Sequence, residues 1–79
     1  MRIKKIPLQV AADLMGKNYN FIRIGLQRGL LPFGSALKTH AGNPRGRYTY
    51  YISPRLFMEF TGCSEEEIIN IAKKRGYSV

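Results

Sequence analysis

Only three residues, Gly16-Lys17-Asn18, separate two stretches whose apolar residues follow a helical spacing. In the stretch 7–15, apolar side chains recur every three or four residues, at Leu8, Ala11, Ala12 and Met15. In the stretch 19–28, a second stripe of this kind is made up of Tyr19, Ile22, Leu26 and Leu30. This spacing predicts two short helices joined by a tight turn, the arrangement of a helix-turn-helix.

Residues that start or stop helices bound both stretches. Pro7 fits a first helical position, where no N–H is needed, and Gly16 fits a left-handed cap at the end. Asn18 is a good N-cap for the second helix, and Gly29 is expected to end it. Gly25 lies inside that helix, where we expect it to allow close packing against the first helix.

The pattern then changes to that of a β-hairpin. Strands are predicted over 35–39 and 47–52, the second rich in aromatic and β-branched residues. The segment 40–46 holds two glycines, an asparagine and a proline, so we expect it to form a long protruding loop. Strand alternation places Tyr48 and Tyr50 on the same side of the sheet as Ile52.

Two further helices are predicted after the hairpin. Ser53-Pro54 supplies an N-cap and a first helical residue, and Gly62 closes that helix after residue 61. Ser64 and Glu67 have the spacing of a capping box, which opens a last helix that ends near Gly76. The aromatic residues expected in the core are Tyr48, Tyr50, Phe57 and Phe60.

Length and charge limit the kind of protein and its partner. The 79 residues are enough for one small α+β domain, with its core expected within 6–62 and a helical extension over 63–79. Residues 1–55 hold ten Lys and Arg and one acid, whereas residues 56–79 hold three Lys and Arg and four acids. A basic body with a nearly neutral tail favours a polyanion such as nucleic acid, the alternative being a solubilising surface.

Several other classes are disfavoured. A lone cysteine, Cys63, excludes an internal disulfide and fits a reducing cytoplasm, where we expect a small buried thiol. His40 is the only histidine and has no carboxylate near it in sequence, so neither a metal site nor a catalytic dyad is expected. No apolar run approaches the roughly 18 residues of a membrane span. We therefore expect a protein that is not an enzyme and has no cofactor, metal, membrane partner or small-molecule effector.

The order of these elements resembles the small winged helix-turn-helix proteins of the excisionase and MerR-like group. The residues that carry this resemblance span about 6–62 and are Ala11-Ala12, Gly16-Lys17-Asn18, Phe21-Ile22-Arg23, Arg28-Gly29-Leu30-Leu31-Pro32 and Tyr50-Tyr51-Ile52-Ser53-Pro54-Arg55. Departures are Pro7 in place of an opening serine or threonine and a longer wing loop. The sequence also shows no long dimerisation helix after the wing, which disfavours a complete ligand-sensing regulator.

The resemblance implies that the second helix enters the major groove of duplex DNA and that the hairpin acts as a wing. It also implies a non-catalytic, excisionase-like factor in a bacterial host cytoplasm, associated with the nucleoid. Such a factor directs an integrase to excise a phage or mobile element, with the integrase and neighbouring copies as further partners. The alternatives are a small transcriptional regulator of the same fold, a protein-interaction adaptor, and an RNA-binding module, which needs a four-stranded sheet.

Helical geometry identifies candidate DNA contacts on the second helix. Asn20, Arg23, Ile24 and Gln27 share the face opposite the apolar stripe. Arg23 can donate twice to guanine, and Asn20 and Gln27 can each pair with adenine, whereas Ile24 suits a thymine methyl or burial against the wing. The alternative for these polar side chains is an ordinary solvent face. At the helix ends, Tyr19 and Arg28 are placed for phosphate.

Three basic residues flank the hairpin loop, at Lys38, Arg45 and Arg47. They can follow the DNA backbone or reach into the minor groove, or they can protect exposed strand edges. A basic arm formed by Arg2, Lys4 and Lys5 can add phosphate contacts, or it can be disordered. The segment 63–79 can contact a neighbouring copy or the integrase, or it can pack on its own domain.

Overall fold

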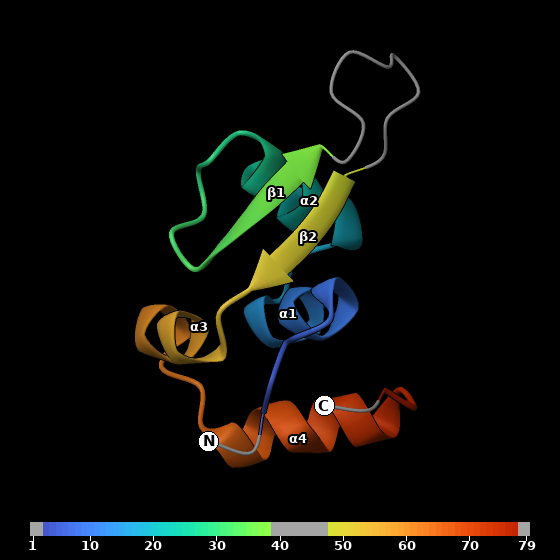
Figure 1. Ribbon diagram of the computed structural model, residues 1–79. Helices are drawn as coiled ribbons and strands as arrows, with labels where there is room; N and C mark the ends of the chain where they lie inside the picture. The colour runs from blue at the N-terminus through green and yellow to red at the C-terminus, as the bar shows by residue number, and fades with distance from the viewer. Residues whose placement is uncertain (1–2, 39–47, 78–79) are drawn as a thin grey trace.

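A computed structural model describes residues 3–38 and 48–77, in which helices and strands follow the order predicted from the sequence (Figure 1). The elements are α1 (Leu8–Met15), α2 (Tyr19–Gln27), β1 (Gly34–Lys38), β2 (Tyr48–Ile52), α3 (Pro54–Thr61) and α4 (Glu65–Lys74). The chain is thus a small compact α+β domain, with two helices, a two-stranded antiparallel hairpin and two further helices along the sequence. None of the described helices is long and apolar enough to cross a membrane.

The turn between α1 and α2 forms as the sequence indicates. Gly16 caps α1 with φ 67°, and the Asn18 side chain accepts a hydrogen bond from the Phe21 N–H at 2.8 Å. Pro7 was expected at the first helical position but is the N-cap itself, because its ψ of 147° is extended and the helix begins at Leu8. The cap positions therefore fix both helix ends that meet at the turn.

Gly25 does not serve the purpose that the sequence suggested. A Cβ on Gly25 would lie 2.7 Å from Cδ1 of Leu31, so the glycine admits a side chain from the following loop and not the first helix. Leu31 is 8% exposed, whereas Leu30 and Tyr19, which the sequence placed on the apolar stripe, are 70% and 41% exposed. The chain reverses at Gly29 with φ 68°, and this turn carries Leu31 inward in place of Leu30.

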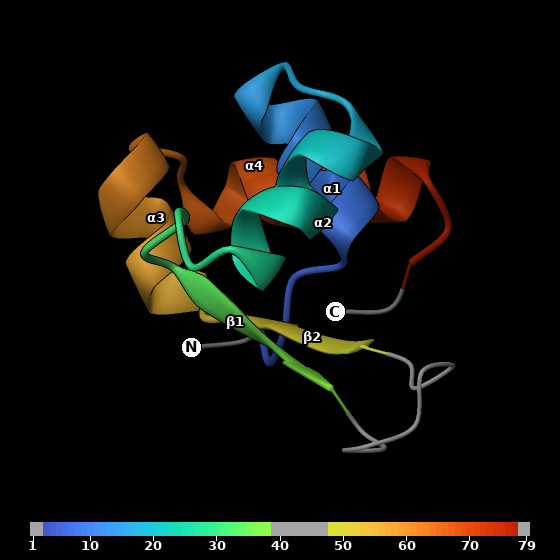
Figure 2. The same cartoon turned by 90° about the horizontal axis from the view of Figure 1, so that it is seen from above.

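The hairpin pairs Ala36 with Tyr50 and Gly34 with Ile52. Ile52 is buried and Tyr50 half-buried, while Tyr51 between them is exposed, so the predicted alternation is confirmed. The sheet packs along one side of α2 and projects beyond the helices at its loop end (Figure 2). The predicted strand ends at 39 and 47, and the loop 40–46 with its histidine, lie outside the described residues.

Phe33 and Phe57 form the aromatic centre of the core. Both are fully buried, and their rings meet edge to face at 5.0 Å. Phe33 comes from the loop before β1 and was not identified from the sequence. Two residues expected in the core are exposed instead, Tyr48 at 41% and Phe60 at 53%. Phe60 only borders the core, with its ring 5.4 Å from that of Phe33, because two aromatic rings already fill the centre.

The core extends beyond 6–62 on both sides. Ile3 is 4% exposed, and Ile68 and Ala72 of α4 are fully buried against the rest of the domain. The segment before α1 passes beside α4 on its way to α1 (Figure 1), and Ile3 and Ile6 anchor it in the core, so Lys4 and Lys5 are exposed on a packed segment and not on a free arm. Of the two alternatives for 63–79, α4 therefore packs on its own domain.

Candidate nucleic-acid interface

The exposed face of α2 carries a preformed pair of polar side chains. Ile22 and Leu26 point into the core at 0% and 3% exposure, which turns Asn20 and Arg23 outward. Nε and Nη2 of Arg23 each lie 3.3 Å from Oδ1 of Asn20 and donate to it. One edge of the guanidinium is thus held by the helix, while its remaining N–H groups stay available to a ligand.

Gln27 lies on the same face but has a different partner. Its Nε2 donates to the Tyr50 hydroxyl of β2 at 2.5 Å, a contact between residues 23 positions apart in sequence. This hydrogen bond joins α2 to the hairpin and fixes their relative position. One of the two amide N–H groups of Gln27 is therefore used within the protein, and the other N–H and Oε1 have no described partner.

The remaining α2 candidates lie at the two ends of the helix. Tyr19 opens α2 and is 41% exposed, and Arg28 is the C-cap and is exposed. A cation at this end is favoured by the negative end of the helix dipole. Ile24, for which burial against the hairpin was one alternative, is 40% exposed instead.

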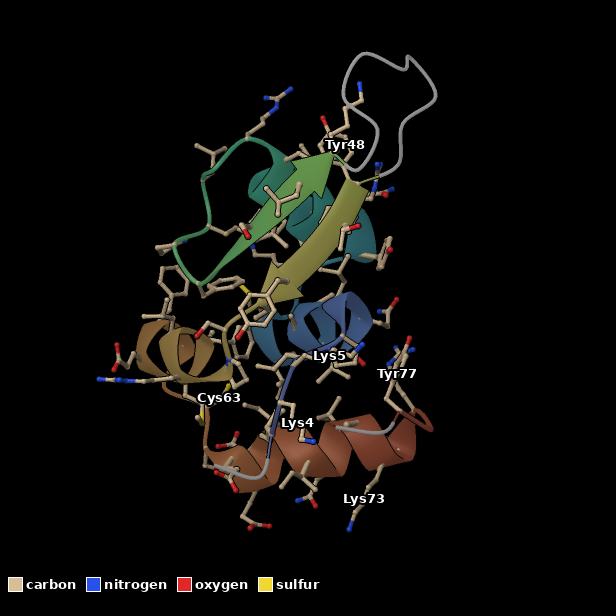
Figure 3. The ribbon with its side chains drawn as sticks, viewed as in Figure 1. Lys4, Lys5, Tyr48, Cys63, Lys73 and Tyr77 are labelled. Carbon is tan, nitrogen blue, oxygen red and sulfur yellow. The ribbon has the colours of Figure 1, made fainter. Side chains whose placement is uncertain are left out.

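The hairpin brings Lys38 and aromatic side chains to the same edge of the molecule. Tyr48 lies at the end of the sheet (Figure 3), where it pairs with Lys38. Its ring stacks on that of Tyr50, with 6.1 Å between the centroids. Tyr51 is 50% exposed on the opposite side of β2. The exposure of Tyr48 was missed because its place on the same side as Ile52 suggested the core, whereas Tyr51 was expected on the opposite side. Arg45 and Arg47 lie outside the described residues.

Charge is distributed unevenly over the described surface. No acidic residue occurs between positions 14 and 58, which include α2 and both strands. Within the described ranges, Lys17, Arg23, Arg28 and Lys38 take part in no ion pair. The surface formed by α2 and the hairpin therefore carries positive charge that no described carboxylate balances.

The acids lie on α1, α3 and α4 and have partners within the domain. Arg75 donates to both carboxylate oxygens of Asp13, with Nη2 3.0 Å from Oδ1. This hydrogen bond lowers the pKa of Asp13 below its ordinary value, against a smaller effect of burial. Arg55 lies 3.5 Å from Glu59 on α3, and Glu67 completes the capping box of Ser64.

The described residues show little that could support metal or thiol chemistry. No group of three His, Cys, Asp or Glu among residues 3–38 and 48–77 could hold a metal ion. Cys63 was expected to be buried but is only half-buried, because it lies in the loop between α3 and α4. Its backbone N–H donates to the Thr61 hydroxyl at 3.2 Å, which ties this loop to the end of α3.

Comparisons with protein-family models, with curated proteins and with solved structures find no match to this chain. The interpretation of the α2–hairpin surface therefore depends on its own geometry and charge.

Proposed function

We propose that the chain binds duplex DNA sequence-specifically through α2 and the hairpin, as a winged helix-turn-helix. The observation that carries the proposal is the Asn20–Arg23 pair on the exposed face of α2, within a surface that has cations and no acids. In this proposal α1 and α2 form the helix-turn-helix and the hairpin is its wing.

The geometry suits an arginine that reads guanine. The major groove is wide enough for a helix such as α2, and guanine presents O6 and N7 there as two acceptors. Because two donors of Arg23 are held by Asn20, its side chain is partly ordered before it meets DNA. Preordering lowers the conformational entropy lost on binding. Tyr19 and Arg28 at the ends of α2, and Lys38 at the end of β1, are exposed and suited to phosphate contacts.

Gln27 and Tyr50 have a positioning role in this proposal. Their hydrogen bond holds β2 against α2, so the separation between the reading helix and the wing is set by the protein before it binds DNA. A fixed separation supports recognition of one register along the duplex.

The resemblance noted in the sequence extends the proposal to a biological role. We infer an excisionase-like architectural factor that binds DNA while an integrase performs the chemistry. A small transcriptional regulator of the same fold would bind DNA through the same face, so the location of the target site distinguishes the two roles.

The test compares two variants that each remove one positive charge. Arg23→Ala lies on the proposed reading face, and Lys73→Ala lies on α4, at the end of the molecule away from Tyr48 (Figure 3). We expect Arg23→Ala to weaken a specific duplex by about 1–3 kcal/mol and to weaken random duplex much less. Lys73→Ala should leave both affinities nearly unchanged. The affinities are measured by fluorescence anisotropy. Equal losses of affinity in the two variants would mean that Arg23 does not recognise a base.

A further inference from the structure

An open groove of about 410 Å³ lies along α2 and the loop that follows it, beside the Asn20–Arg23 pair. Its walls are three large apolar side chains that solvent reaches: Phe21 at 44% exposure, Ile24 at 40% and Leu30 at 70%. Leu31 forms the floor. Single apolar residues are common on protein surfaces, but a contiguous exposed group around a concave site is typical of a protein- or ligand-binding site.

The floor of the groove depends on Gly25. Because a Cβ at this position would meet Leu31 at 2.7 Å, the glycine lets Leu31 lie directly against the helix. Leu31 therefore sits below the level of Ile24 and Leu30, and the surface between them is hollow. A helix with an ordinary side chain at position 25 would have to push Leu31 away from it.

The charges around the groove have one sign. Arg28 lies at its rim, and Nζ of Lys17 lies 5.4 Å from the centroid of the Phe21 ring. Neither cation is in an ion pair within the described residues, and no acid lines the groove. The site thus combines an apolar floor with a cationic rim.

We propose that this groove docks an acidic amphipathic helix of a partner protein. Apolar side chains at positions i, i+3 or i+4, and i+7 of that helix fill the groove, and its carboxylates lie beside Lys17 and Arg28. The floor and walls disfavour DNA as the occupant, because a phosphate backbone offers nothing to bury against Phe21, Ile24 and Leu30. Asn20 and Arg28 line the groove and also belong to the proposed DNA interface, so the docked helix and duplex DNA would compete for this part of α2.

A second exposed apolar site, on α3, serves as a comparison within the same domain. Leu56 and Phe60 there are apolar like the groove walls and similarly exposed, at 45% and 53%. Glu59 on the same helix, however, is acidic. If apolar exposure alone drove docking, both sites would bind the same helix. If the charge also decides, an acidic helix selects the groove.

The experiment titrates the ¹⁵N-labelled full chain with a synthetic helical peptide that has leucines along one face and glutamates elsewhere. We expect saturable NMR shift changes at Phe21, Ile24 and Leu30 and little change at Leu56 and Phe60. A peptide of the same composition in scrambled order should not bind. A peptide with lysine in place of glutamate should bind at least about tenfold more weakly.

Two leucine variants of matched exposure test the location. Leu30→Glu should weaken peptide binding at least about tenfold, whereas Leu37→Glu on the hairpin should not, although the two leucines are 70% and 68% exposed. Both side chains point to solvent, so both variants are expected to fold, which their NMR spectra check. Equal effects of the two variants, or no saturable shifts with the acidic peptide, would overturn the proposal.

Adding duplex DNA separates this proposal from the proposed function. Because Asn20 and Arg28 belong to both sites, duplex DNA is expected to compete with the peptide. Duplex binding by a protein that shows no saturable peptide shifts at Phe21, Ile24 and Leu30 would overturn the docking proposal alone. Peptide bound at the groove in a protein that binds no duplex would support docking and refute only the DNA-binding proposal.

Discussion

Replacing Ile68 by alanine tests whether α4 is part of the folded domain. Ile68 is completely buried in the cluster that includes Val10 and Ala11 of α1. Removing three carbons from such a site costs about 2–5 kcal/mol, from lost burial and the cavity left behind. A domain of 79 residues has roughly 4–12 kcal/mol of unfolding free energy in total. The variant should therefore lose a large share of its stability.

The assay is urea unfolding followed by far-ultraviolet circular dichroism, with Ile69→Ala as the matched control. Ile69 is on the same helix and has the same side chain, but it is only half-buried. We expect the Ile69→Ala variant to lose about 1 kcal/mol of unfolding free energy. If Ile68→Ala stayed within about 0.5 kcal/mol of the unchanged protein, the packing of α4 on α1 would be refuted. Deleting 64–79 should, for the same reason, unfold the domain.

Three further perturbations test other contacts by the same unfolding assay. Gly34→Ala should cost about 1–3 kcal/mol, because the new Cβ overlaps a carbonyl oxygen of the facing strand. Tyr50→Phe should cost about 0.5–1.5 kcal/mol, since it removes the acceptor of Gln27 Nε2. Asp13 has its pKa lowered by Arg75, so its contribution is present above the ordinary value of 3.8 and is lost as the pH falls through the lower folded pKa. Asp13→Asn should remove this part of the acid sensitivity.

Each of these has a result that contradicts it. An unchanged midpoint for the Gly34 variant would mean that the strands do not approach so closely. A Tyr50→Phe protein as stable as the parent would mean that the hydrogen bond to Gln27 is absent in solution. Identical stability–pH curves for the parent and the Asp13→Asn protein would mean that the Asp13–Arg75 ion pair does not contribute to stability in solution.

The helix ends could be predicted from sequence because local chemistry determines them. Asn18 accepts from the N–H three residues later, and Ser64 and Glu67 form both hydrogen bonds of a capping box. Gly16 and Gly62 take the left-handed conformation at C-caps, as expected. These features depend on neighbours within a few residues, which a single sequence displays.

The division of apolar residues between core and surface could not be predicted as well. Phe33, in a loop without a regular period, became the centre of the core, whereas Tyr48 and Phe60 stayed exposed. Which aromatic ring fills the centre depends on how loops cross the helices. That information is tertiary, as is the contact between Gly25 and Leu31.

The candidate site shows the same division. Sequence periodicity placed Asn20, Arg23 and Gln27 on one face of α2, and all three lie there. The pairing of Asn20 with Arg23 and of Gln27 with Tyr50 was not foreseen. The second pairing joins residues 23 positions apart, and only the packing of the hairpin on α2 brings them together.

The most direct test of the central claim is a binding measurement with the unchanged protein. Short duplexes that tile the DNA around its own gene are titrated by gel shift across a salt series. If α2 reads the DNA sequence, the protein should bind one or more tiles at least about 1,000-fold more tightly than the others at physiological salt. Weak binding that is equal for all tiles and disappears with salt would mean that only the net charge of +8 attracts DNA, and would contradict recognition by α2.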